Sequence, residues 1–221
     1  MRKLYRTFPE IMHVHSVLIP ISVFTPIVLL AECLDQNVLI ETCEHYQKRS
    51  FRNRFFLPSG NVLQMLSIPL RKGKNESLPI RLVEIANELP WREQHIKTLQ
   101  SIYGRSPYFI FYKDELFELI QNGPNSLYDF DLKSLKWLLK MLKLDTTLSE
   151  TQSYEKETKE EILDLRSALK PSLFEGKYLP SYWGSDPVPA QSSALDLLFH
   201  MGPDSYSYLE SIQGIDLLTK L

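Results

Sequence analysis

The stretch VLIPISVFTPIVLLAECLDQNVLIE, residues 17–41, decides the fold class of this 221-residue chain. The apolar, β-branched run over residues 14–21 predicts a buried strand. Residues 27–34 predict a short helix, and VLIE at 38–41 predicts a second buried strand. A strand, a helix and a strand in this order indicate a small mixed or parallel sheet.

The same run also has features of an export signal, because a positively charged start at residues 2–6 precedes it. Glu32, however, stands where a cleavage site needs a small residue, and Pro20 and Pro26 interrupt the apolar run. The run is also shorter than the roughly 20 residues of a membrane-spanning helix. We therefore expect a folded segment, with no export signal and no membrane span.

Composition narrows the class of protein further. Hydrophobic residues make up 43% and charged residues 24% of the chain, as in ordinary soluble globular proteins. A formal net charge of -2 disfavours a surface built for a polyanion. The two cysteines, Cys33 and Cys43, exclude a disulfide framework within the chain and fit a reducing, cytoplasmic compartment.

Beyond the first unit, turn signals and helical periodicity predict the remaining elements. Residues 55–86 predict a hairpin or meander, with strands at 62–70 and from residue 79. Three helices are expected at about 91–103, 106–123 and 126–144, the second with Ser106 as its cap and Pro107 in its first turn.

The last third of the chain is less regular. The acid-rich residues 145–165 predict an exposed loop that leads into a short helix. Residues 170–190, with four prolines, predict an irregular excursion, and a closing helix follows Ser193. We expect one α/β domain over residues 14–221, with a small mixed sheet confined to 14–86, after an irregular lead-in of residues 1–13.

Standard catalytic and phosphate-binding motifs are absent from the sequence. It contains no GxxxxGK[ST], no strand-following GxGxxG, no HExxH and no GxSxG. The five histidines are scattered, with only His13 and His15 close together. We predict neither a metal site nor a cofactor.

One segment is unusually basic: EHYQKRSFRNRFF, residues 44–56. If it is extended, one face carries Tyr46, Lys48, Ser50, Arg52 and Arg54, in steps of about 6–7 Å from one residue to the next. Two guanidinium groups can grip a carboxylate or phosphate bidentately. The alternatives are cations that face water or pair with nearby glutamates (Glu41, Glu44, Glu84). Nucleic-acid binding is disfavoured, because no second basic cluster is as dense.

Two further residues are candidates for chemistry. His95 lies one helical turn after Trp91 and has the side chain best suited to acid–base work near neutral pH. A core histidine is the alternative. Asp196 lies in the first turn of the closing helix, where it is either a site carboxylate or a favourable partner of the helix dipole.

The order of YQKRSFRNR, LSIPL, PWREQHIKTLQSIYGRSPYF and SALDLLFHMG resembles the WbqC-like family of bacterial proteins, from about residue 18 to 209. The resemblance implies a place in the biosynthesis of O-antigen and other surface polysaccharides. The family's early Q-P-x-Y-x-P turn is IPISVFTP here, without the glutamine. The positions that match the family are Tyr46, Lys48, Arg52, Asn53, Arg54, Trp91, His95, Tyr103, Pro107, Tyr108 and Asp196.

These observations predict a cytoplasmic protein that binds an anionic ligand, a nucleotide or nucleotide-activated sugar, and transfers a small acyl-type group to it. Lys48, Arg52 and Arg54 would hold the anion, and Asn53 would orient it. Tyr46, Trp91 and Tyr103 are the other expected ligand-binding residues, and His95 and Asp196 the expected catalytic ones. The alternative is a non-catalytic partner of a pathway enzyme, which would bind through the acidic loop and the excursion.

Overall fold

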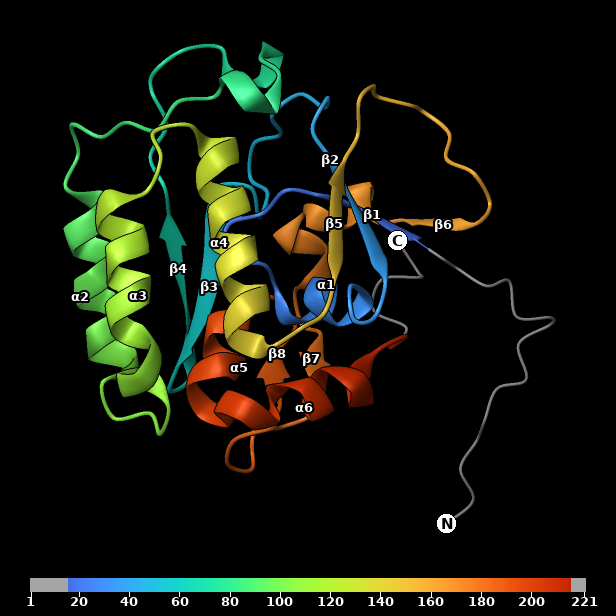
Figure 1. The fold of residues 1–221 in the computed structure, drawn as a ribbon. Coiled ribbons are helices and arrows are strands. Elements are labelled where there is room, and N and C mark those ends of the chain that lie inside the picture. Colours follow the sequence, from blue (N-terminus) through green and yellow to red (C-terminus); the bar gives the residue numbers. More distant parts are fainter. Residues whose placement is uncertain (1–15, 216–221) are drawn as a thin grey trace.

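The computed structural model describes residues 16–215. The expected lead-in of residues 1–13 lies outside this range, as do His13 and His15. Within it, the chain forms both helices and a parallel sheet with small antiparallel ribbons, which confirms the predicted α/β fold class. Figure 1 shows a parallel sheet on one side of the molecule and a pair of helices on the other, with the remaining elements between them.

The parallel sheet begins with the predicted strand–helix–strand unit. β1 (Ser16–Pro20) and β2 (Asn37–Glu41) pair in parallel, and α1 (Ile27–Glu32) connects them. Val17 and Ile19 of β1 are buried, as are residues 27–31 of α1. This burial explains why the sequence reads as nearly continuous apolar runs.

The sheet is not confined to residues 14–86, so that part of the prediction is wrong. β5 (Thr147–Glu150) pairs with β2, and β6 (Ile162–Asp164) pairs with β1, giving the all-parallel order β5-β2-β1-β6. Both added strands come from the segment expected to be a loop and a short helix. They are three or four residues long and lie at the edges, where a strand needs little apolar sequence.

A separate hairpin follows the first unit. β3 (Arg54–Ser59) and β4 (Val62–Ser67) are antiparallel and joined at Gly60, whose φ of 56° suits glycine. This confirms the first part of the expected hairpin or meander. The strand expected from residue 79 is wrong, because a 3-10 turn at Ile80–Leu82 and single bridges take its place.

The basic segment is not an extended strand either. Residues 48–53 lie in turns and bends, and Arg49 has a positive φ of 54°. The alternation that would place the cations along one face therefore does not occur before Arg54, where β3 begins.

The predicted helices are present in the middle of the chain. They are α2 (Trp91–Tyr103), α3 (Phe109–Asn122) and α4 (Leu127–Leu142). Ser126 caps α4 by accepting a hydrogen bond from the backbone of Asp129 at 3.3 Å. α3 begins at Phe109 without a side-chain cap, so the expected capping role of Ser106 is wrong.

The C-terminal segments close the core. β7 (Tyr178–Leu179) and β8 (Val188–Pro189) form a short antiparallel ribbon within the irregular excursion. The closing helix α5 (Ala194–Met201) is buried from residue 194 to 199, and Ser193 caps it as predicted. α6 (Ser205–Ile212) follows. The remaining 3-10 turns are Asn75–Ser77, Arg166–Leu169, Pro171–Phe174 and Gly202–Asp204.

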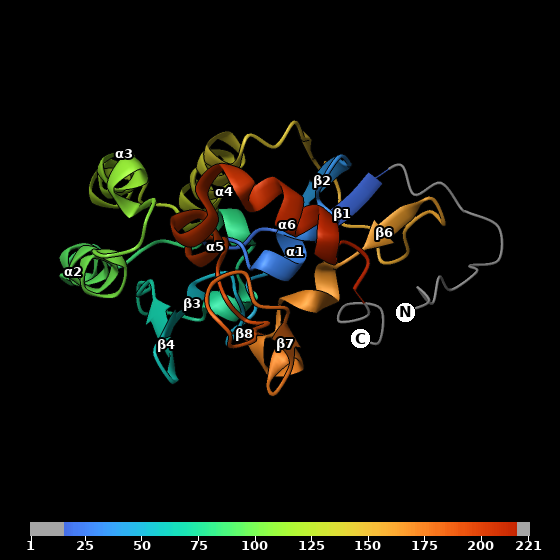
Figure 2. The same cartoon turned by 90° about the horizontal axis from the view of Figure 1, so that it is seen from below.

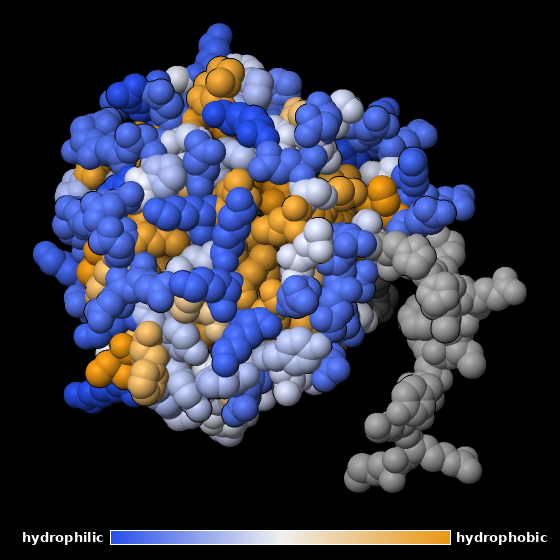
Figure 3. All heavy atoms as spheres, in the orientation of Figure 1, coloured by the Kyte–Doolittle hydropathy of each residue, from blue (hydrophilic) through white to orange (hydrophobic). Residues whose placement is uncertain are grey.

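Figure 2 shows α4, α5, α6 and α1 together in the middle of the molecule, between the α2–α3 pair and the parallel sheet. Phe24 packs between these parts. Its ring centroid is 5.0 Å from that of Phe55 in β3 and 6.2 Å from that of Phe130 in α4. Polar residues cover most of the face in Figure 3, with an apolar area between α4 and the sheet. Over residues 16–215, no helix has the length and apolar character to cross a bilayer.

Candidate functional site

A cavity of about 830 Å³ opens where three parts of the chain meet. The β3–β4 turn forms one wall, the end of α2 forms a second, and the irregular excursion of residues 174–191 forms a third. α5 contributes Asp196 and His200. A space of this size suits a small-molecule ligand. The polar and aromatic side chains that line it are Ser59, Asn61, Ser101, Tyr103, Phe174, Lys177, Tyr178, Tyr182, Trp183, Asp186, Gln191, Asp196 and His200.

Asp196 is the centre of a hydrogen-bond cluster in this cavity. Its Oδ1 accepts a hydrogen bond from the Tyr103 hydroxyl at 2.8 Å, and its Oδ2 accepts one from Tyr182. Burial raises the pKa of the Asp196 carboxyl, although the two hydroxyls and His200 oppose that change. Burial and the adjacent carboxyl also hold the pKa values of Tyr103 and Tyr182 well above the ordinary value. Both tyrosines therefore keep their protons at neutral pH and donate them to Asp196, while burial disfavours the charged form of the Asp196 carboxyl.

His200 lies one turn after Asp196 on α5. Its Nδ1 is 2.9 Å from the Asp196 carbonyl oxygen and 3.6 Å from Oδ1 of the same residue. A carbonyl oxygen only accepts, so Nδ1 carries the proton and Nε2 offers a lone pair. The Trp183 ring covers the imidazole at 5.3 Å. His200 is thus fixed in one tautomer with its other nitrogen available.

His200 and Tyr182 are the residues that sequence reasoning missed. The i, i+4 spacing of Asp196 and His200 on a helix, inside the quoted SALDLLFHMG segment, was a signal that could have identified the histidine. Tyr182 offered no such signal. It reaches Asp196 only because the excursion folds back over α5.

The mouth of the cavity is aromatic. Tyr178 and Trp183 line it and are 60% and 55% exposed. Large aromatic rings that face water beside a polar cavity provide flat surfaces for a ligand ring. Together with the hydroxyls below, they suit a ligand that has both an apolar face and many hydroxyl groups.

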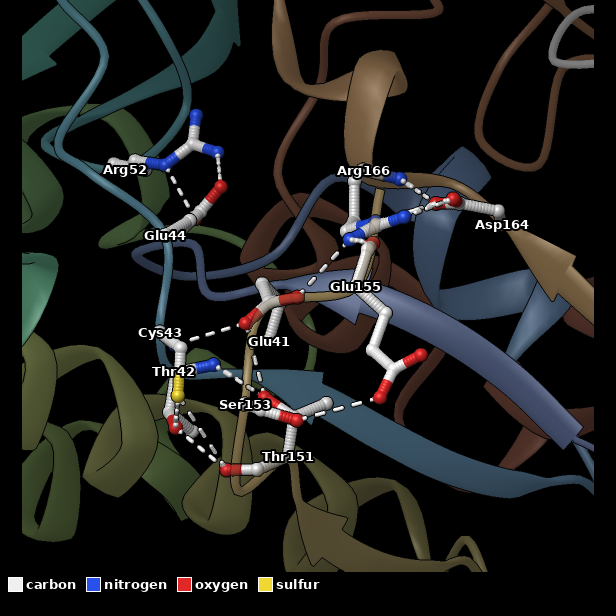
Figure 4. Close-up of polar contacts among 10 residues, drawn as sticks. All are labelled: Glu41, Thr42, Cys43, Glu44, Arg52, Thr151, Ser153, Glu155, Asp164 and Arg166. Atoms are coloured by element: carbon white, nitrogen blue, oxygen red, sulfur yellow. Dashed lines mark hydrogen bonds and ion pairs between the residues drawn. The ribbon is translucent and has the colours of Figure 1, made fainter. Parts of the chain in front are cut away.

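The predicted anion-binding cations lie elsewhere. Arg52 is fully buried and donates from Nε and Nη2 to the two carboxylate oxygens of Glu44, at 2.8 and 2.5 Å (Figure 4). Lys48 pairs with Glu76 on the surface at 2.8 Å. Arg54 is partly buried at the start of β3. None of these three residues lines the 830 Å³ cavity.

Several predicted site residues nevertheless come together inside the molecule. The Tyr46 hydroxyl donates to Asn53 at 2.9 Å, and Asn53 contacts Ser67 at 3.4 Å. His95 approaches the backbone of Ser67, and its ring is 5.1 Å from that of Trp91. Burial lowers the pKa of His95 to about 4, so this imidazole is neutral at physiological pH.

This interior cluster and the cavity lie at opposite ends of α2. His95 and Tyr103 are eight residues apart, or about 12 Å along a helix. The structure therefore brings Tyr103 and Asp196 together in the cavity, and Tyr46, Asn53, Trp91 and His95 together in the interior. The two expected catalytic residues, His95 and Asp196, belong to different groups.

A third polar group lies at the carboxyl edge of the parallel sheet. Arg166 pairs with Glu41 at 3.2 Å and with Asp164 at 2.7 Å, and Thr151 donates to Glu41 at 2.9 Å (Figure 4). Each charge has a partner, which indicates a structural clamp. No group of three or more histidine, cysteine or acidic side chains in the described part of the chain is arranged to hold a metal ion.

A model of the WbqC-like protein family matches residues 29–178. The chain therefore belongs to that family. The match includes the basic segment, α2 and Tyr103, and it ends before Tyr182, Asp196 and His200. Comparisons with curated proteins and with solved structures gave no match.

Proposed function

We propose, on the premise of this family membership, that the chain acts in surface-polysaccharide biosynthesis and binds a nucleotide-activated sugar in the cavity over Asp196. One observation carries the proposal. A buried carboxyl, held by the hydroxyls of Tyr103 and Tyr182 and adjacent to an oriented His200, forms the floor of a cavity of about 830 Å³.

The chemistry of the cavity favours a sugar. A sugar ring offers hydroxyl groups that both donate and accept, and Asp196, Gln191 and the tyrosine hydroxyls provide matching groups. Its apolar face can stack on Trp183 or Tyr178 at the mouth. Lys177 also lines the cavity and supplies positive charge for a phosphate.

The basic segment supports the anion site less well. Lys48, Arg52 and Arg54 stay proposed ligand-binding residues, with Asn53 and Tyr46 beside them. Arg52, however, already has a buried carboxylate partner in Glu44. We therefore place the sugar in the cavity, and we regard Lys177 as the better candidate for phosphate contact because it lines that cavity and Arg52 does not.

For transfer of a small acyl group to the sugar, His200 is the better acid–base candidate. Its Nε2 is available, whereas His95 is buried in the interior with a pKa of about 4. In this proposal His200 takes a proton from the attacking hydroxyl or amino group of the sugar. Asp196 holds the imidazole in place and stabilises its positive charge.

Thermal shift with a panel of nucleotide sugars tests the binding claim. We expect at least one of them to raise the melting temperature of the wild type, and Trp183→Ala to abolish that shift. Tyr154→Ala is the matched control, because Tyr154 is also 55% exposed but lies outside the cavity. No shift with any nucleotide sugar, or equal shifts in both variants, would contradict the proposal.

A non-catalytic role as partner of a pathway enzyme is the second candidate. The adjacent side chains Ile110 and Phe111 on α3 favour it, since they are 64% and 74% exposed. In this case Phe111→Asp would abolish co-purification with the pathway enzyme and leave nucleotide-sugar binding unchanged. If Phe111→Asp still co-purifies with the pathway enzyme, the exposed side chains of α3 no longer support the partner role.

A further inference from the structure

The hydroxyl of Ser106 faces His200. Ser106 lies in the turn between α2 and α3, and its Oγ is 3.3 Å from Nε2 of His200. The hydroxyl does not cap α3, and it is partly exposed to solvent. We propose that Ser106 is a nucleophile activated by His200, and that it carries the acyl group as an ester before transfer to the sugar. This inference rests on the proposed function and adds the step by which the acyl group is held.

The orientation of the imidazole supports this role. Nδ1 donates to the Asp196 carbonyl oxygen at 2.9 Å, which leaves the Nε2 lone pair directed at the Ser106 hydroxyl. A nucleophile next to a base that a third group orients is the usual arrangement of covalent catalysis, and the distance is often longer without substrate. The Asp196 carboxylate, 3.6 Å from Nδ1, can stabilise the imidazolium that forms.

The turn that carries Ser106 is fixed against the end of α5. The backbone N–H of Ser106 donates to the Tyr103 carbonyl at 2.9 Å, and that of Tyr108 donates to the Phe199 carbonyl at 3.0 Å. The Tyr108 ring lies directly over Gly202, where a Cβ would come within 2.4 Å of it. Ser106 is therefore held from both sides next to His200, as a positioned nucleophile needs to be.

The donor in this proposal is an acyl thioester or an activated ester. Ser106 Oγ attacks the acyl carbon and forms a C–O bond, while its proton moves to His200 Nε2. The bond from the acyl carbon to the leaving sulfur or oxygen breaks, and the leaving group takes the proton from the imidazolium. A sugar hydroxyl or amino group then attacks the ester and gives its proton to His200. Ser106 Oγ leaves and recovers that proton, and no electrons are exchanged with another reagent.

Acylation by p-nitrophenyl acetate tests the inference on the full chain. We expect a burst of p-nitrophenolate with an acetyl group that peptide mass spectrometry locates on Ser106. The acetylation rate at this position should fall about a hundredfold or more in His200→Gln. Ser207→Ala is the matched control, because Ser207 is an exposed serine on α6 outside the cavity and should leave the rate unchanged.

Each outcome supports or overturns the inference. Acetyl groups found elsewhere, with Ser106 unmodified in the wild type, would overturn it. So would acetylation of Ser106 at an equal rate in His200→Gln. If a variant fails to fold, the location of the acetyl group on the wild type decides. Nucleotide-sugar binding without Ser106 acylation would overturn this inference and leave the proposed function intact. Ser106 acylation without nucleotide-sugar binding would support the nucleophile and contradict the proposed sugar ligand.

Discussion

Arg52 and Glu44 form an ion pair in the protein interior, with side chains 0% and 4% exposed. The guanidinium uses one edge, Nε and Nη2, to meet both carboxylate oxygens. Figure 4 shows its third nitrogen pointing away from Glu44. The residue that the sequence indicates for anion binding thus already holds an anion, eight residues earlier in the chain.

This pair gives a first prediction. Glu44→Gln should lower the free energy of unfolding by about 3–5 kcal/mol, because it leaves the Arg52 charge buried and uncompensated. Urea denaturation measures the change. The double variant Arg52→Met with Glu44→Leu should recover much of the loss. Lys48→Met, which breaks an exposed pair with Glu76, should cost about 1 kcal/mol or less. Similar small effects in both single variants would contradict the interior position of the pair.

His95 gives a prediction about pH. Its pKa is about 4 in the folded chain and about 6.5 when unfolded. Between these values the unfolded chain binds more protons, so this histidine lowers stability as the pH falls. Once the pH is below both values, the free energy of unfolding is lower by about 3 kcal/mol. The difference in the free energy of unfolding between pH 7 and pH 4 should therefore be smaller in His95→Gln than in the wild type. Urea denaturation at both pH values measures it. An identical pH dependence in the two proteins would rule out a buried neutral imidazole.

Gly202 gives a prediction about the turn that holds Tyr108. Its φ is 52° with ψ of -120°, and a Cβ would lie 2.4 Å from the Tyr108 ring. Gly202→Ala should cost about 1–3 kcal/mol from backbone strain, and more from the clash. Gly60→Ala is the control, with a φ of 56° and no atom within 4 Å of the added Cβ. Thermal unfolding should show a clearly larger loss for Gly202→Ala; equal losses would mean that the ring does not press on this glycine.

Arg166 gives a prediction about local opening. It joins Glu41 and Asp164 across the carboxyl edge of the sheet and donates to the carbonyl of Glu155 at 2.7 Å. In Arg166→Met, amide hydrogen exchange over residues 151–161 should be about tenfold faster or more, because the contacts that close this segment are lost. Arg71→Met, at an exposed pair, should leave it unchanged. Exchange that speeds up equally across the whole chain would indicate global destabilisation instead.

Part of the fold followed from local patterns. Burial on the sheet and the helix made the segments that form β1 and α1 largely apolar, and helical periodicity identified α2 and α4. β5 and β6 gave no such pattern, because strands of three or four residues at a sheet edge are too short to show an apolar period. In the basic segment, turns and bends over residues 48–53 took the place of the extended strand that the alternation suggested.

The candidate site shows the same division. The sequence by itself determined the β1–α1–β2 unit and the central helices, and it singled out Tyr103 and Asp196 through their motifs. Only the tertiary structure decided that these two residues form a hydrogen bond, although they are 93 positions apart in the chain. It likewise placed Ser106 next to His200, which lies 94 positions later. Local patterns record which face of a segment is buried, whereas the partner across a cavity depends on how whole elements pack.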